Sequence, residues 1–252
     1  MKVSLVQSEL YWADKQANLQ MFGEKLAALA GKTDLVVFPE MFTTGFCVDR
    51  PDLAEEMDGE TMSSLSKWAL DYHLAITGSV IITENNHLYN RAFFVFPDGK
   101  IEYADKKHLF SVGQETDFFK AGDKKLIVDY QGFKVCILVC YDIRFPVWSR
   151  NYDLAYDLLV FVANFPAKRI NDWDVLLKAR AIENQSYVCG VNRTGQDGAG
   201  VQYNGHSVLL DYHASELASF ADGEPGVVTC EILREPLDHY RKKFPVWRDA
   251  DK

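Results

Sequence analysis

Three positions in the sequence place a reactive polar side chain directly after an apolar or strand-like run. Cys140 ends the run "KVCILVC" and is followed at once by the polar "YDIR". Glu40 follows "VVFP", and Lys106 lies in "YADKKHLF" after a predicted strand. A cysteine thiol is mostly protonated at neutral pH and needs a base or a cation to become a nucleophile. The three residue types together therefore indicate acyl transfer through a thioester.

The chemistry assigns one role to each of these side chains. Cys140 would be the nucleophile, and Glu40 would take its proton, deliver it to the leaving nitrogen and then activate water. The Lys106 ammonium and the backbone N–H of Tyr141 would stabilise the tetrahedral oxyanion, where one donor is worth roughly 3–4 kcal/mol. Because neighbours in a strand point to opposite faces, only one of Lys106 and Lys107 is expected to face inward.

Each signal alone also has an ordinary structural explanation. A glutamate after a strand is commonly a solvated loop carboxylate, and two adjacent lysines are commonly a solvated edge. A cysteine in an apolar run is commonly a small buried hydrophobic residue, and we expect that fate for Cys47, Cys136 and Cys189. Cys140 differs because the polarity changes at that residue.

Alternating and apolar runs interleave with helical periodicities along the whole chain, which predicts one α/β domain over residues 1–252. Asp14 is a candidate helix cap, and "FPDGK" carries the Asp-Gly of a hairpin turn. Many strands come in hairpin-like pairs, so mixed sheets or two sheets packed face to face fit better than one parallel sheet. Helices are predicted at 14–30, 61–72 and 172–186, and strands at 3–7, 34–40, 74–82, 92–96, 100–110, 158–164, 187–193, 206–211 and 227–232, with two further strands within 126–140 joined around Gln131-Gly132.

The composition is that of an ordinary soluble protein, with 48% hydrophobic and 25% charged residues. A net charge of −9 disfavours non-specific binding to nucleic acid or to an anionic membrane. The N-terminal segment lacks the features of a signal peptide, and no run approaches the ~20 apolar residues of a membrane span. Five cysteines, an odd number, favour free thiols in a reducing compartment, so we expect a cytoplasmic protein without nucleic-acid or membrane partners.

The three segments "FPEMFTTGF", "KKHLF" and "CYDIRFP" resemble, in this order, the Glu-Lys-Cys motifs of the nitrilase superfamily of carbon–nitrogen hydrolases. The resemblance extends through "ARAIENQSYV" and "GHSVLLD". The family pattern Lys-x-His-Leu-Phe selects Lys106 over Lys107. The resemblance implies an α-β-β-α four-layer sandwich with two mixed sheets, paired into an αββα–αββα homodimer. It also implies that Glu115, in "QETDFFKAG", supports Lys106.

"CYDIRFPVWSRN", "VANFPAKR" and the tail "YRKKFPVWRDADK" look similar to the bacterial omega-amidase branch of that superfamily. The resemblance implies hydrolysis of the terminal amide of 2-oxoglutaramate or 2-oxosuccinamate. Such an anion needs a local cation, for which the candidates are Arg169, Lys168 and Arg144, the last with an internal pair to Asp142 as its alternative. Asn164 would make a polar substrate contact, and Phe46 would either wall the pocket or belong to the core.

Other functions remain open on the sequence alone. The six histidines form no pair at zinc-ligand spacing with cysteine or carboxylate, so we expect no metal. "GQDGAG" at 195–200 follows a strand without opening a helix, so it reads as a loop, and no cofactor is expected. Within the superfamily, the alternatives are a carbamoylase, a nitrilase or another amidase. A catalytically silent dimeric interaction module is the alternative from another class.

Overall fold

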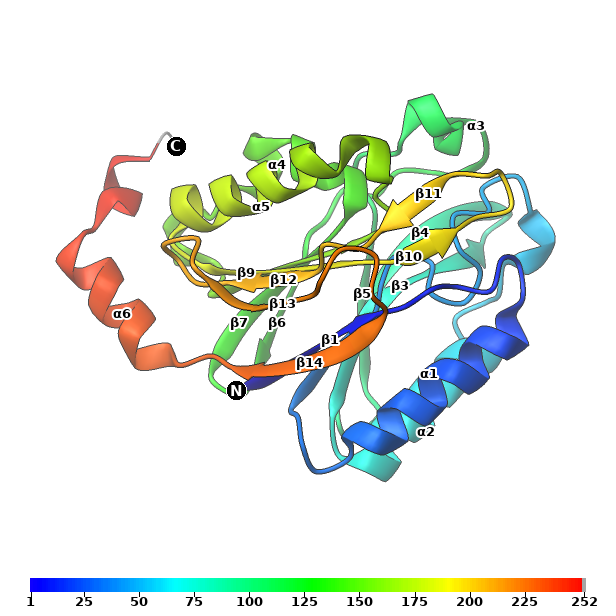
Figure 1. The fold of residues 1–252 in the computed structure, drawn as a ribbon, viewed down its shortest axis with the longest axis horizontal. Helices are drawn as coiled ribbons and strands as arrows, with labels where there is room; N and C mark the ends of the chain where they lie inside the picture. Colours follow the sequence, from blue (N-terminus) through cyan, green and yellow to red (C-terminus); the bar gives the residue numbers. More distant parts are fainter. Residues whose placement is uncertain (251–252) are drawn as a thin grey trace.

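The computed structural model describes residues 1–250, so the last two residues of the tail motif, 251–252, lie outside it. Two six-stranded mixed sheets form the centre of the molecule (Figure 1). The first sheet has the order β14 (Gly226–Glu231), β1 (Lys2–Gln7), β2 (Leu35–Val37), β3 (Ala75–Glu84), β4 (His87–Val95) and β5 (Ile101–Asp105). The second has the order β13 (Glu216–Ser219), β12 (Val208–Leu210), β9 (Tyr187–Asn192), β8 (Leu158–Ala163), β7 (Phe133–Val139) and β6 (Leu126–Tyr130).

The helices cover the outer faces of the two sheets. In Figure 1, α1 (Lys15–Leu29) and α2 (Glu60–Tyr72) lie on one side, whereas α4 (Pro146–Ser149) and α5 (Ile170–Asn184) lie on the other. This is the predicted α-β-β-α layering, and it confirms the fold class. The remaining elements are α3 (Glu115–Phe118), α6 (Arg234–Lys243), the hairpin of β10 (Thr194–Gln196) and β11 (Gln202–Asn204), and 3₁₀ turns at Pro51–Leu53, Ser111–Gly113, Cys140–Arg144, Tyr152–Leu154, Ala167–Arg169 and Val246–Asp249.

Alternation along the strands of the first sheet divides its side chains between two cores. Leu35 and Val37 of β2 pack with the second sheet, whereas Val36 between them packs with α1 and α2. Phe94 and Phe93 of β4 divide in the same way. Because successive side chains of a strand point to opposite faces, the first sheet packs against the second sheet on one face and against α1 and α2 on the other. The core between the two sheets fixes the position of one sheet against the other.

Most of the predicted elements are confirmed to within a few residues. The strand predicted at 100–110 is shorter and ends at Asp105, so that Lys106 follows it, and helix α6 was not predicted. The Asp14 side chain accepts from the backbone N–H of Ala17 at 3.0 Å and caps α1, as predicted. "FPDGK" forms the turn between β4 and β5, and 195–200 lies in the β10–β11 hairpin rather than at the start of a helix. Within residues 1–250, no helix is both long and apolar enough to cross a membrane.

Candidate active site

The three predicted reactive residues follow strands that point in the same direction within their sheets. In the first sheet, β2 and β3 are parallel, and β5 runs the same way because it and β3 are both antiparallel to β4. Glu40 follows β2 and Lys106 follows β5, so both lie at the carboxyl edge of this sheet. Cys140 directly follows β7 of the second sheet, where β7, β8 and β9 are parallel. The site therefore forms where the carboxyl edges of the two sheets meet.

Backbone hydrogen bonds fix the segments that carry the acid and the amine. In the turn after Glu40, the N–H of Met41 donates to Ser79 Oγ of β3 at 2.9 Å. The N–H of Lys106 donates to the carbonyl of Asn90 at 2.9 Å, and its own carbonyl accepts from Gly122 at 2.8 Å. A β-carbon at Gly122 would lie 2.1 Å from the carbonyl oxygen of the residue before Lys106. The close approach of this segment to β5 therefore requires glycine.

The Lys106 ammonium lies between two carboxylates in a fully buried site. Its Nζ donates to Glu40 Oε1 at 2.9 Å and to Glu115 Oε2 at 2.8 Å, and all three side chains are shielded from solvent. Burial alone would lower the pKa of Lys106, but the charges of Glu115 and Glu40 outweigh burial and hold that pKa above its ordinary value. Lys106 is therefore a permanent cation in this site, whereas Lys107 faces the ring of Trp148.

Cys140 begins a 3₁₀ turn with a left-handed backbone, at φ +44°. Its side chain is almost completely buried, and Sγ lies 4.0 Å from the carbonyl oxygen of Asn164. Burial is the main cause that raises the pKa of the thiol far above its ordinary value, and the neighbouring Glu40 charge adds to it while Lys106 opposes it. The resting thiol is therefore neutral, and it requires a proton acceptor before it can attack.

Asp142 braces the turn that carries the thiol. One oxygen, Oδ2, accepts from the backbone N–H of Val139 at 3.1 Å, next to Cys140. The other, Oδ1, accepts from the backbone N–H of His108 at 3.0 Å and lies 2.8 Å from His108 Nδ1. The His108 ring in turn stacks on Phe145, with centroids 3.7 Å apart. Asp142 thus ties the segment after Lys106 to the segment of Cys140.

Two of the predicted substrate-contact residues, Phe46 and Arg169, lie around the site. The Phe46 ring faces the Lys106 ammonium at 5.6 Å and contacts the ring of Phe110 at 6.4 Å. Phe110 packs against Tyr141, the predicted oxyanion donor, with centroids 5.1 Å apart. The Arg169 guanidinium lies over the Phe110 ring, 5.2 Å from the ring centroid. These aromatic rings therefore connect Arg169 to the vicinity of Lys106 and Tyr141.

Asn164, also predicted to contact substrate, is bound to Glu40. Its backbone N–H donates to Glu40 Oε2 at 2.8 Å, and its Nδ2 donates to the Glu40 carbonyl at 2.7 Å. Asn164 Oδ1 is buried and has no hydrogen-bond partner among the described residues. Asn164 follows β8 of the second sheet, so these two bonds join Glu40 directly to the opposite sheet.

The structure shows a different partner for Arg144 from the one weighed in the sequence. Arg144 Nη2 pairs with Asp172 at 2.6 Å, and its guanidinium lies 5.7 Å from the Phe165 ring. The alternative pair with Asp142 is wrong, because the Asp142 carboxylate is occupied by His108 and Val139. The spacing of two residues within a 3₁₀ turn does not bring those two side chains together.

Asn90 belongs to the site but did not stand out in the sequence. It lies within β4, is fully buried, and its Nδ2 donates to Glu40 Oε1 at 2.8 Å and to Glu115 Oε1 at 3.0 Å. Glu115 also accepts from the backbone N–H of Phe110 at 2.7 Å. The only sequence signal for Asn90 is a polar residue before the apolar run "AFFVF", which is common at the start of a buried strand segment.

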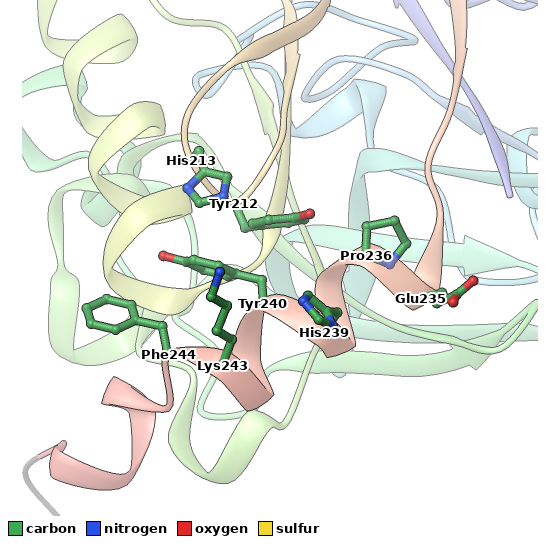
Figure 2. A pocket seen from close by; sticks show the side chains of 8 residues that line it. All are labelled: Tyr212, His213, Glu235, Pro236, His239, Tyr240, Lys243 and Phe244. Atoms are coloured by element: carbon green, nitrogen blue, oxygen red, sulfur yellow. The ribbon is translucent and has the colours of Figure 1, made fainter.

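A separate cavity of about 780 Å³ lies between α6 and the turn after β12 (Figure 2). In it, the rings of Tyr212 and Tyr240 stack with centroids 4.8 Å apart, and His213 packs edge-on against Tyr240. None of the predicted reactive residues lines this cavity. Among residues 1–250, no group of three His, Cys, Asp or Glu side chains is arranged to hold a metal ion.

Comparisons with known proteins agree with this geometry. The model of the carbon–nitrogen hydrolase family matches residues 2–242. Omega-amidase YafV of Escherichia coli (strain K12) is 40% identical over 252 residues, which is 100% of this chain and 97% of that protein. The 2-oxoglutaramate amidase of Bacillus subtilis (strain 168) is 31% identical over 255 residues, covering 99% of this chain and 97% of that protein.

Among solved structures, XC1258 of Xanthomonas campestris, described as a CN-hydrolase superfamily protein with an arsenic adduct in its active site, superposes with a TM-score of 0.97. It is 39% identical and covers 100% of this chain and 97% of that one. An amidase from Nesterenkonia shares the fold, with a TM-score of 0.85 at 23% identity over 97% of this chain and 95% of that one. This chain belongs to the carbon–nitrogen hydrolase family of the nitrilase superfamily, and it is similar over its whole length to bacterial omega-amidases.

Proposed function

We propose that the protein is an omega-amidase that hydrolyses the terminal amide of a short 2-oxo dicarboxylic acid monoamide to the keto acid and ammonia. 2-Oxoglutaramate and 2-oxosuccinamate are the substrates of choice. The observation that carries the proposal is the buried group of Glu40, Lys106 and Glu115 beside the Cys140 thiol. Full-length similarity to proteins named omega-amidase and 2-oxoglutaramate amidase supports the choice of substrate.

The reaction begins with a proton transfer that the neutral thiol requires. Glu40 takes the Cys140 proton as Sγ attacks the amide carbon, and the Lys106 ammonium and the Tyr141 N–H stabilise the resulting oxyanion. Glu40 then gives the proton to the nitrogen, so that ammonia leaves and a thioester remains on Cys140. The buried ion pairs of Lys106 support this role, because they hold its charge in place without solvent.

The second half of the reaction consumes water. Glu40 removes a proton from a water molecule as the water oxygen attacks the thioester carbon. The Lys106 ammonium and the Tyr141 N–H again stabilise the oxyanion. The intermediate then collapses to the carboxylic acid, and the sulfur regains its proton. Glu115 supports both steps of the reaction by accepting two hydrogen bonds from Lys106 and so holding its ammonium in place.

Arg169 is our choice for the cation that binds the remote carboxylate. Arg144 already pairs with Asp172, whereas Arg169 forms no ion pair within residues 1–250 and lies against Phe110. Because the protein carries a net charge of −9, attraction for an anion has to come from a local group such as this guanidinium. Phe46 and Asn164 complete the proposed contacts.

We also propose a homodimer that pairs through the outer face of α5. Trp173, Leu177 and Ala181 form the buried stripe of this helix, whereas Val175 and Ile182 are 57% and 55% exposed. The two exposed residues are seven positions apart and therefore share one face of the helix. The free thiols favour a reducing compartment, so we place the protein in the cytoplasm.

A kinetic panel tests the substrate. Ammonia release is measured with 2-oxoglutaramate, glutamine, asparagine, a carbamoyl amine and a simple nitrile, and 2-oxoglutaramate is expected to have the highest kcat/KM. Arg169→Met should lower kcat/KM for 2-oxoglutaramate about 10-fold to 100-fold, the worth of a charge-assisted hydrogen bond, and leave a neutral amide unaffected. The matched control is Lys168→Met, which removes a neighbouring exposed cation. Comparable kcat/KM values across the panel would contradict the proposed substrate. Equal losses of kcat/KM in Arg169→Met and Lys168→Met would contradict the role of Arg169.

A further inference from the structure

The side chain of Asn90 is a polar group of the site that has no role in the proposed mechanism. Its Nδ2 is the only atom of the side chain with hydrogen-bond partners among the described residues, and both partners are carboxylate oxygens. They belong to Glu40 and Glu115, which arrive from different elements, the turn after β2 and helix α3. The main-chain carbonyl of Asn90 meanwhile accepts from the N–H of Lys106. Asn90 therefore touches every charged member of the site.

The orientation of this amide follows from the charges around it. Flipping the amide would direct Oδ1 at two carboxylates, which accept hydrogen bonds and do not donate them. With Nδ2 in that place, both of its protons are used, and Oδ1 is left buried without a partner among residues 1–250. A buried acceptor without a partner destabilises a fold. The orientation of the amide therefore gives each carboxylate a hydrogen bond and leaves the Asn90 oxygen without a partner among the described residues.

Asn151 shows what a structural asparagine looks like in the same protein. It is also buried, and its Nδ2 donates to the carbonyls of Tyr156 and Asn184 at 2.9 and 3.1 Å. Its Oδ1 accepts from the Tyr156 N–H at 3.1 Å, so every polar atom of its side chain has a partner. Asn151 joins neutral backbone groups, whereas Asn90 joins two charged ones.

The charge balance explains why a neutral donor is needed. Two carboxylates face one ammonium, and Lys106 donates to both of them at 2.8–3.2 Å. A second cation would neutralise the group and would compete with Lys106 for Glu40. An amide instead supplies one hydrogen bond to each carboxylate without adding charge. It holds Oε1 of each carboxylate next to the same nitrogen.

We propose that Asn90 is a positioning residue that keeps the Glu40 carboxylate aimed at the Cys140 thiol by bridging Glu40 to Glu115. The proposal rests on the proposed amidase function. Without the amide, two carboxylates would face each other in a buried site with only Lys106 between them. Glu40 would lose the hydrogen bond that ties its Oε1 to Glu115 through the amide, and a carboxylate displaced from the thiol takes its proton less readily.

The test is the pair of kcat and KM in Asn90→Leu, a change that keeps nearly the same volume. Because Asn90 is proposed to place the base and not to bind substrate, kcat should fall about 10-fold to 100-fold while KM stays within about twofold of the wild type. The control is Asn151→Leu, which should lower the unfolding temperature and leave kcat unchanged. A kcat in Asn90→Leu equal to that of the wild type would overturn the proposal.

A second readout needs no substrate. The rate at which iodoacetamide alkylates Cys140 at neutral pH, followed by mass spectrometry of its peptide, should fall by a similar factor in Asn90→Leu. If the wild type hydrolyses none of the amides, the proposed function fails while this alkylation rate still decides the role of Asn90. If Asn90→Leu does not fold, Asn90→Ala replaces it, and an unchanged alkylation rate in that variant would equally refute the bridge.

Discussion

At the scale of single residues, the position of Cys140 combines reactivity with backbone strain. A left-handed conformation at a residue with a β-carbon costs about 1–2 kcal/mol relative to an ordinary conformation. Cys140 adopts it at φ +44°, directly after the strand residue Val139. The next residue in this turn is Tyr141, whose N–H is the proposed oxyanion donor. Strain at a functional position is a recurrent feature of such sites.

Substitution of the thiol should separate the two properties. We expect Cys140→Ala and Cys140→Gly both to lose turnover by about 10,000-fold or more, because each lacks the nucleophile. Glycine relieves the left-handed strain, so Cys140→Gly should resist urea better than Cys140→Ala by up to about 1 kcal/mol. Ammonia release and urea unfolding measure the two effects.

Cys189 provides the comparison for this pair. It is a fully buried cysteine within β9 and is not among the residues with positive φ. There, glycine should be the less stable of the two substitutions. Substantial turnover by Cys140→Ala would contradict the proposed mechanism, and a less stable Cys140→Gly would contradict the strain.

Some residues of the candidate site can be recognised in the sequence, and others cannot. The change of polarity after an apolar run pointed to Glu40, to Cys140 and to the pair Lys106–Lys107, because strand ends at a sheet edge leave this mark in one short segment. The family resemblance then selected Lys106. Asn90 and Asp142 leave no such mark, since their roles depend on partners from other elements. The partner of Arg144 was missed for the same reason.

At the scale of elements, local signals predicted the helices and strands well, whereas the pairing of distant elements was not predicted. The Asp14 cap and the "FPDGK" turn are confirmed because their hydrogen bonds lie within a few residues. The placement of β14 beside β1 joins residues more than 200 positions apart. No local pattern encodes such a neighbour.

His206 illustrates a contact between distant elements with a measurable pH dependence. Its Nδ1 lies 2.9 Å from Asp174 of α5, and its Nε2 lies 3.0 Å from Asp222, in the segment before β14. Burial lowers the pKa of His206, but the hydrogen bonds that its ring donates to Asp222 and Asp174 outweigh burial and raise that pKa above 6.5. A raised pKa means that the folded protein holds the proton more tightly than the unfolded chain.

His206→Gln should therefore destabilise the protein more at pH 6 than at pH 9. The stabilisation by the charged imidazole is fully present below its unfolded pKa and is lost as the pH rises through the folded value. Unfolding temperatures of the wild type and the variant at the two pH values measure the difference. An equal decrease at both would show that the charge on His206 contributes nothing.

At the scale of the whole molecule, the exposed face of α5 provides a test of assembly. Ile182→Glu places a charge on the proposed interface, and we expect it to convert a dimer into a monomer in light scattering. Leu70→Glu is the control, because Leu70 is 47% exposed on α2 in the opposite helix layer. A wild type that is monomeric at micromolar concentration, or equal effects of both variants, would refute the proposed interface.

The bonds between Glu40 and Asn164 also bear on how activity is acquired during folding. Glu40, Lys106 and Asn90 follow or lie within strands of the first sheet. Cys140 and Asn164, which binds Glu40, follow strands of the second sheet. Neither half of the chain contains the complete set of reacting groups. After dilution from denaturant, turnover should return only when the two sheets have docked, so recovery of enzymatic rate reports the last stage of renaturation and never an earlier one.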